Sequence, residues 1–110
     1  MTINIKATNT TLTDAIRSVI EGKVSALESF LRPEDVIYIE VDEDTKHKSG
    51  QFHRAEIRIQ PHGHYAEARG NDFYEALDLV IPKMKDQLAK EKDKRISLRR
   101  RLGSFFKRNR

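Results

Sequence analysis

The stretch from residue 71 to residue 95 constrains the fold of this chain more than any other part of it. Its apolar residues recur at steps of three and four, which is the spacing of one face of an α-helix; they are Phe73, Ala76, Leu77, Val80, Met84 and Leu88. Asp72 is a good N-cap for this helix, and Glu75 three residues later completes a capping box. A helix cannot bury its own apolar stripe, so the rest of the chain must provide the surface on which this one lies.

Four shorter stretches alternate between apolar and polar residues, which is the period of a β-strand with one buried face; they are residues 2–7, 36–44, 52–60 and 64–69. The last three are joined by residues 45–51, which indicate a hairpin loop, and by the tight turn Pro61-His62-Gly63. Links this short permit only antiparallel neighbours, so these three strands should form a meander.

A second amphipathic helix fits between the first two strands, from the capping pair Thr11 and Asp14 to about residue 31. Arg32-Pro33 ends it, because the residue before a proline is disfavoured in helical geometry. Gly22 lies inside this helix, and one reason to tolerate a glycine there is close contact with a neighbouring backbone.

The element order is therefore β-α-β-β-β-α, which predicts an α+β fold. We expect a two-layer sandwich, a four-stranded sheet with both helices on one face, in which the first strand pairs in parallel with a meander strand. Pro82 falls ten residues past the cap of the last helix. Since the apolar spacing continues beyond it, we expect one kinked helix; the alternative is that Pro82 begins a new one.

Positive charge is concentrated at the C-terminal end of the chain. Residues 83–110 contain twelve Lys and Arg against three Asp and Glu, whereas the whole chain has a net charge of +4. Such a basic end on a nearly neutral body favours a polyanion as partner, nucleic acid before membrane. The alternative is a solvated helix face followed by a disordered tail. We divide the chain into an α+β domain, residues 1–95, and a basic tail, residues 96–110, disordered when free.

Catalytic and metal-binding patterns are weak in this sequence. There is no cysteine, and His62 and His64 form an H-x-H pair without a third ligand at convincing spacing. The acidic residues Asp42, Glu43 and Asp44 lack the pattern of a calcium loop and suit a solvated hairpin tip. No nucleophile motif or phosphate-binding glycine loop is present. We expect a binding protein and not an enzyme, with no metal, cofactor or small-molecule substrate.

No apolar run approaches the length that spans a membrane, and Met1 is followed by a strand pattern instead of a signal peptide. The expectation is a cytoplasmic protein without a membrane partner.

The last helix also carries two motifs, DFYEALD at residues 72–78 and KMKDQL at residues 83–88. With the element order and the N-terminal matches Asn4-Ile5 and Ala15-Ile16-Arg17, they resemble the short ribosome hibernation promoting factor family, which includes the ribosome-associated inhibitor of translation. The resemblance covers about residues 1–95.

This resemblance implies a bacterial stress-response protein that binds rRNA of the small ribosomal subunit in the channel for mRNA and tRNA, and inhibits translation on idle ribosomes. It also implies a chain that is monomeric off the ribosome. Lys23, Lys83 and Lys90 match positions that are usually basic in the family. Ala26, Ser29 and Asp86 depart from it, since relatives often carry basic residues there.

Basic residues on the helices are the predicted rRNA contacts, and their phosphate contacts should make binding salt-dependent. They are Lys23, Lys83, Lys85, Lys90, Lys92, Lys94, Arg95, Arg99, Arg100 and Arg101. Three strand residues, Arg54, Arg58 and Arg69, are secondary candidates, for which cross-strand pairing with Glu56 and Glu67 is the alternative.

Two other functions fit the same residues. One is a general double-stranded RNA-binding or RNA-chaperone domain, which can also pack helices on one side of a small sheet. The other is a protein-interaction module whose basic tail docks an acidic partner. For residues 96–110 the alternative to an RNA contact is a helix that lies on a membrane surface.

Overall fold

The computed structural model describes the backbone of residues 2–44 and 52–108, with side chains through residue 102. The elements follow the predicted order; they are β1 (Thr2–Thr8), α1 (Asp14–Val24), the 3₁₀ helix η1 (Ser25–Phe30), β2 (Val36–Glu43), β3 (His53–Gln60), β4 (His64–Gly70) and α2 (Phe73–Arg108). The hairpin loop predicted for residues 45–51 lies outside the described residues.

The strands form a four-stranded sheet in the order β1-β2-β3-β4. β1 runs parallel to β2, and the β2–β3 and β3–β4 pairs are antiparallel. The predicted meander and the parallel first pair are both confirmed. A parallel pair needs a long connection, and only the β1–β2 connection contains a helix.

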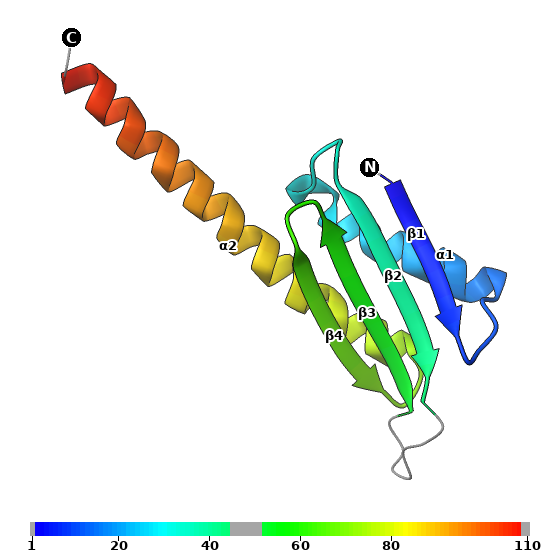
Figure 1. Ribbon diagram of the computed structural model, residues 1–110. Coiled ribbons are helices and arrows are strands. Elements are labelled where there is room, and N and C mark those ends of the chain that lie inside the picture. Colours follow the sequence, from blue (N-terminus) through cyan, green and yellow to red (C-terminus); the bar gives the residue numbers. More distant parts are fainter. Residues whose placement is uncertain (1, 45–51, 109–110) are drawn as a thin grey trace.

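Both helices cover one face of the sheet, and the other face is open (Figure 1). The core lies between the two layers. The sheet contributes the inward residues of the strands, and α2 contributes the stripe predicted from its spacing; the most deeply buried members include Ile37, Ile39, Ile57, Ile59, Leu77, Val80 and Met84. The predicted α+β sandwich is therefore the observed fold.

Helix α1 differs from the prediction at both ends. Its N-cap is Thr13, whose Oγ1 accepts from the backbone N–H of Ile16 at 3.1 Å, and not Thr11. The α-helix ends at Val24, and the chain continues to Phe30 as a 3₁₀ helix. The tighter turns keep Leu27 fully buried while the chain approaches the start of β2.

The close backbone contact expected at Gly22 occurs at Gly70 instead. A Cβ on Gly22 would have no atom within 4 Å, whereas a Cβ on Gly70 would lie 2.7 Å from the backbone nitrogen of Ala76. Gly70 ends β4 immediately before α2 begins, so its missing side chain lets the first turn of α2 pack directly on the strand.

Helix α2 is a single helix of 36 residues that passes through Pro82. Its cap is the predicted one, since the Glu75 backbone N–H donates to the Asp72 carboxylate at 2.8 Å. The alternative that Pro82 starts a separate helix is wrong, and a kink there stays a prediction. Residues 96–108 continue the same helix beyond the sheet as a projecting rod (Figure 1); their disorder in the free chain likewise stays a prediction.

Candidate nucleic-acid interface

The predicted basic residues of α2 form two rows along the helix. With 3.6 residues per turn, residues seven or eleven positions apart share a side of the helix. One row, here the β4-side row, contains Lys83, Lys90, Lys94 and Arg101; the other, the η1-side row, contains Lys85, Lys92 and Arg99.

Two contacts orient the rows relative to the domain. Lys83 Nζ donates to the backbone carbonyl of Glu67 on β4 at 3.0 Å. Lys92 Nζ lies 5.6 Å from the centre of the Phe30 ring at the end of η1. The two rows therefore lie on opposite flanks of the buried stripe, and both extend along the projecting part of the helix.

Several of these cations have intramolecular partners. Lys23 of α1 is paired with Asp78 of α2, and Lys90 lies 3.0 Å from Asp86 one turn earlier. Exposed pairs of this kind contribute little to stability, because water competes for both charges. A phosphate could replace either carboxylate at small cost.

Five other predicted contacts form no ion pair within the described part of the chain; they are Lys85, Lys94, Arg99, Arg100 and Arg101. All five are exposed. The structure thus gathers most of the predicted set on one rod-shaped surface, and their contact with RNA stays a prediction. Lys23 lies apart from this set, on α1.

Gln87, which was not among the predicted site residues, fixes α2 against the edge strand together with Lys83. Gln87 Nε2 donates to the backbone carbonyl of Tyr65 at 2.6 Å, next to the Lys83 contact. Because β4 is an edge strand, these two side chains satisfy carbonyls that no further strand pairs with. A signal was present in the sequence, since polar residues at regular helical spacing flank the apolar stripe.

Glu91 attaches the helix at the start of β4, next to the Gln87 contact. Its carboxylate contacts Nε2 of His64 and lies 3.9 Å from a guanidinium nitrogen of Arg32. Burial alone raises the pKa of Glu91, but the hydrogen bond with His64 and that ring's charge outweigh it, so the pKa is lowered. His64 therefore has its partner within the protein.

The nearby His62 also contacts other side chains of the protein. Its Nδ1 lies 3.4 Å from Asp35, and its Nε2 lies 2.8 Å from a guanidinium nitrogen of Arg32. Among the described residues, no group of three or more His, Asp or Glu side chains could hold a metal ion. No described helix has the length and apolar character needed to cross a membrane.

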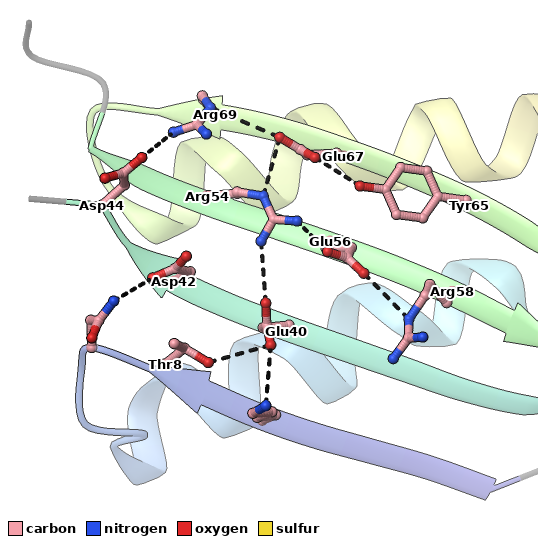
Figure 2. A network of polar contacts seen from close by, with 12 residues as sticks. Thr8, Glu40, Asp42, Asp44, Arg54, Glu56, Arg58, Tyr65, Glu67 and Arg69 are labelled. Carbon is pink, nitrogen blue, oxygen red and sulfur yellow. Dashed lines mark hydrogen bonds and ion pairs between the residues drawn. The ribbon is translucent and has the colours of Figure 1, made fainter. Parts of the chain in front are cut away.

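The open face of the sheet carries a network of charges. Paired positions across β2, β3 and β4 place Glu40, Glu56 and Glu67 directly side by side. Arg54 lies over this row of glutamates and contacts all three carboxylates (Figure 2), at 3.2 Å from Glu40 and 3.1 Å from Glu67. Its side chain is only 15% exposed.

The contacts in this network shift the pKa values of Arg54, Tyr65 and Glu67. Burial alone lowers the pKa of the Arg54 guanidinium, but hydrogen bonds to Glu67 and Glu56 outweigh it and raise the pKa. The hydroxyl of Tyr65 donates to Glu67, which raises the pKa of Tyr65 and, together with Arg54, lowers the pKa of Glu67.

The secondary RNA candidates are therefore engaged with carboxylates on this face. Besides Arg54, Arg58 contacts Glu56 at 3.3 Å, and Arg69 lies 3.5 Å from Asp44 (Figure 2). Cross-strand pairing, the alternative given for these arginines, occurs at Arg54, whereas Arg58 pairs with Glu56 of its own strand and Arg69 with Asp44 just beyond β2. The open sheet face is consequently balanced in charge, whereas the outer side of α2 carries an excess of cations.

Comparison with known proteins gives the same fold and a consistent set of relatives. Residues 3–96 match the family described as "Sigma 54 modulation protein / S30EA ribosomal protein". The chain is 34% identical over 94 residues to a ribosome hibernation promoting factor of Klebsiella oxytoca, covering 86% of this chain and 96% of that protein. It is 35% identical over 97 residues to one of Azotobacter vinelandii, covering 87% of each.

Solved structures of similar proteins have the same fold. The N-terminal domain of Thermus thermophilus Protein Y superposes with a TM-score of 0.67 at 26% identity, covering 82% of this chain and 98% of that one. A ribosomal subunit interface protein from Coxiella burnetii gives the same TM-score at 21% identity, which shows the shared fold, and covers 84% of this chain and 99% of that one. On its sequence match and its architecture, this chain belongs to the Sigma 54 modulation protein / S30EA ribosomal protein family, together with the ribosome hibernation promoting factors.

Proposed function

We propose that this chain is a ribosome hibernation factor, which binds the small ribosomal subunit in the channel for mRNA and tRNA and inhibits translation on idle ribosomes. The observation that carries the proposal is the division of charge between the two faces. Both basic rows lie on α2, while the cations of the open sheet face are neutralised by carboxylates. The names of the relatives support the same function.

The mechanism that we propose is occlusion. The β4-side row and the η1-side row neutralise rRNA phosphates, and Lys23 adds a contact from α1 once Asp78 gives way. Arg95, Arg99, Arg100 and Arg101 extend the contact beyond the sheet. The folded domain then occupies the volume that mRNA and tRNA need, so no bond is made or broken and no catalytic residue is required.

Several features follow from this proposal. The protein acts in the cytoplasm, where ribosomes are, and its partners are rRNA and the small subunit. It is monomeric when it is off the ribosome, because the repulsion between two highly basic helices opposes self-association. Neither a cofactor nor a small-molecule substrate takes part.

Sedimentation with purified ribosomal subunits tests the proposal. We expect the chain to comigrate with small subunits and with vacant ribosomes at physiological salt, and to protect rRNA nucleotides in the mRNA and tRNA channel from chemical probes. Equal affinity for a naked RNA duplex of matched length would instead identify a general double-stranded RNA-binding domain, and binding only to large subunits would refute the proposed site.

A pair of double variants separates specific helix contacts from loss of charge. Lys90→Gln with Lys94→Gln removes two cations from the β4-side row, and Lys6→Gln with Arg58→Gln removes two from the open sheet face. We expect the first pair to weaken ribosome binding by roughly tenfold or more and the second by less than about twofold, because each phosphate contact adds a counterion-release contribution. Equal losses would show that the helix rows are not the contact surface.

A further inference from the structure

The apolar stripe of α2 does not end where the sheet ends. Leu98 follows Val80 by eighteen residues, and Leu102 follows Met84 by the same interval. Eighteen residues are five full turns, so both leucines lie on the helix side that is buried within the domain. Val80 and Met84 are fully buried, whereas Leu98 is 58% exposed and Leu102 is 47% exposed.

Basic residues border this exposed stripe on both sides. Lys94 and Arg101 precede and follow Leu98 by about one turn along one flank. Arg95 and Arg99 lie about one turn before Leu98 and Leu102 along the other flank. Ile96 and Arg100 are on the opposite side of the helix. The end of α2 therefore has a narrow apolar centre between two cationic edges.

Neither the domain nor the family match accounts for this segment. Every described side chain from Ile96 to Leu102 is exposed, and the helix projects away from the sheet (Figure 1). The match to the family ends at residue 96. Burial of half-exposed leucines is favourable because it removes apolar surface from water, so a complex in which a partner covers the stripe is stabilised by it.

We propose that the Leu98–Leu102 stripe docks, on the ribosome, in an apolar groove of a protein whose edges carry carboxylates. The proposal rests on the proposed function, because the end of α2 can reach a neighbouring ribosomal protein only if the folded domain is bound to rRNA. Carboxylates at the groove edges pair with Arg101 on one side and with Arg95 and Arg99 on the other, so that these three arginines contact the protein in place of rRNA phosphates, while Lys94 keeps its rRNA contact. Arg100, on the opposite side, stays available for rRNA.

Other occupants match the stripe less well. RNA phosphates suit the cationic edges, but they gain nothing from the leucines between them. A second copy of the chain would place like charges edge to edge, because residues 96–108 contain five basic residues and no acidic residue. A helix that lies on a membrane has a broad apolar face, and here the arginines at both edges leave only a narrow one.

Site-specific photo-crosslinking on vacant bacterial ribosomes tests the inference. The photoreactive residue p-benzoylphenylalanine replaces Leu98 or Leu102 in the stripe, and replaces Ile96 as the matched control. Ile96 is also an exposed apolar residue of the same segment but faces the other way. We expect a crosslink to one ribosomal protein from both stripe positions, identified by mass spectrometry, and none to that protein from residue 96.

The outcomes separate the inference from the proposed function. Chains that sediment with small subunits but crosslink from the stripe only to rRNA, or to a second copy of the chain, overturn the inference and leave the function standing. Chains that do not sediment with ribosomes refute both. Stripe-dependent flotation with phosphatidylglycerol vesicles, without a ribosomal protein crosslink, would identify a membrane-surface helix instead.

An affinity measurement gives a second, independent readout. Leu98→Asn removes an apolar side chain from the stripe, and Ile96→Asn removes one from the opposite side of the same turn. At salt high enough to screen phosphate contacts, we expect Leu98→Asn to weaken ribosome binding roughly fivefold and Ile96→Asn by less than about twofold. Equal effects would contradict a one-sided docking surface. Both positions are exposed, so neither change disturbs the core.

Discussion

Arg54 Nε lies 3.1 Å from the carboxylate of Glu67, and the same guanidinium contacts Glu40 and Glu56 on the neighbouring strands. One largely buried cation thus holds three carboxylates that the sheet register places side by side. Like charges directly opposite each other destabilise a sheet, so the stability of this face depends on Arg54.

Replacement of Arg54 by Met should destabilise the fold by about 2–3 kcal/mol, because it leaves three neighbouring carboxylates without their shared cation. Urea denaturation followed by circular dichroism measures the change. Arg58→Met is the control, since Arg58 is 53% exposed and, among the described residues, has an ion pair with Glu56 and a cation–π contact with Tyr38, and it should cost less than about 1 kcal/mol. Addition of Glu56→Gln to Arg54→Met should recover part of the loss; no recovery would contradict the repulsion argument.

The network also predicts how stability depends on pH. The pKa of Glu67 is lowered from its ordinary value of 4.5, because Tyr65 and Arg54 donate hydrogen bonds to its carboxylate. A group with a lower pKa in the folded state stabilises the fold above its unfolded pKa, and this contribution is lost as pH falls through the folded pKa. The free energy of unfolding should therefore decline as pH falls below about 4.5.

Tyr65→Phe tests this assignment, since it removes only the hydroxyl that donates to Glu67. The variant should be less stable than the parent at neutral pH and should show a shallower decline in acid. Tyr74→Phe removes the hydroxyl of a tyrosine with similar exposure, 46% against 47%, and should leave the pH profile unchanged. Identical profiles for Tyr65→Phe and the parent would show that this hydrogen bond does not set the pKa of Glu67.

Two glycines should respond in opposite directions to the same substitution. Gly70→Ala places a Cβ 2.7 Å from the Ala76 backbone nitrogen, so the start of α2 must move, at a cost of about 1–3 kcal/mol. Gly22→Ala meets no atom within 4 Å inside α1 and should stabilise the protein by about 0.5–1 kcal/mol. Thermal denaturation of both variants is sufficient, and a stabilising Gly70→Ala would disprove the close approach.

Salt dependence reports directly on the basic rows. The logarithm of the ribosome association constant should fall linearly with the logarithm of salt concentration, because each phosphate contact releases counterions. Lys90→Gln with Lys94→Gln should reduce that slope by about 1.4–1.8, the value for two lost contacts. Fluorescence anisotropy of the labelled chain across a salt series measures it, with Lys6→Gln and Arg58→Gln as the control; an unchanged slope would place the contacts elsewhere.

Local patterns were sufficient for most of the architecture. The three- and four-residue spacing from Phe73 to Leu88 identified the buried side of α2, and strict alternation identified all four strands, because each has one face against the helices. The short links fixed the antiparallel pairs. The Asp72 cap was also predicted correctly, because capping involves only residues three positions apart in the sequence.

The sequence by itself determined the fold class, the family and the basic character of α2, because those depend on composition and on spacing within one element. Only the tertiary structure decided which cations are available. Arg54 and Arg99 are the same residue type, but strand register surrounds Arg54 with carboxylates, while the end of α2 leaves Arg99 exposed without an ion pair among the described residues. Contacts between residues distant in the chain are set by how the layers pack, and no local pattern encodes them.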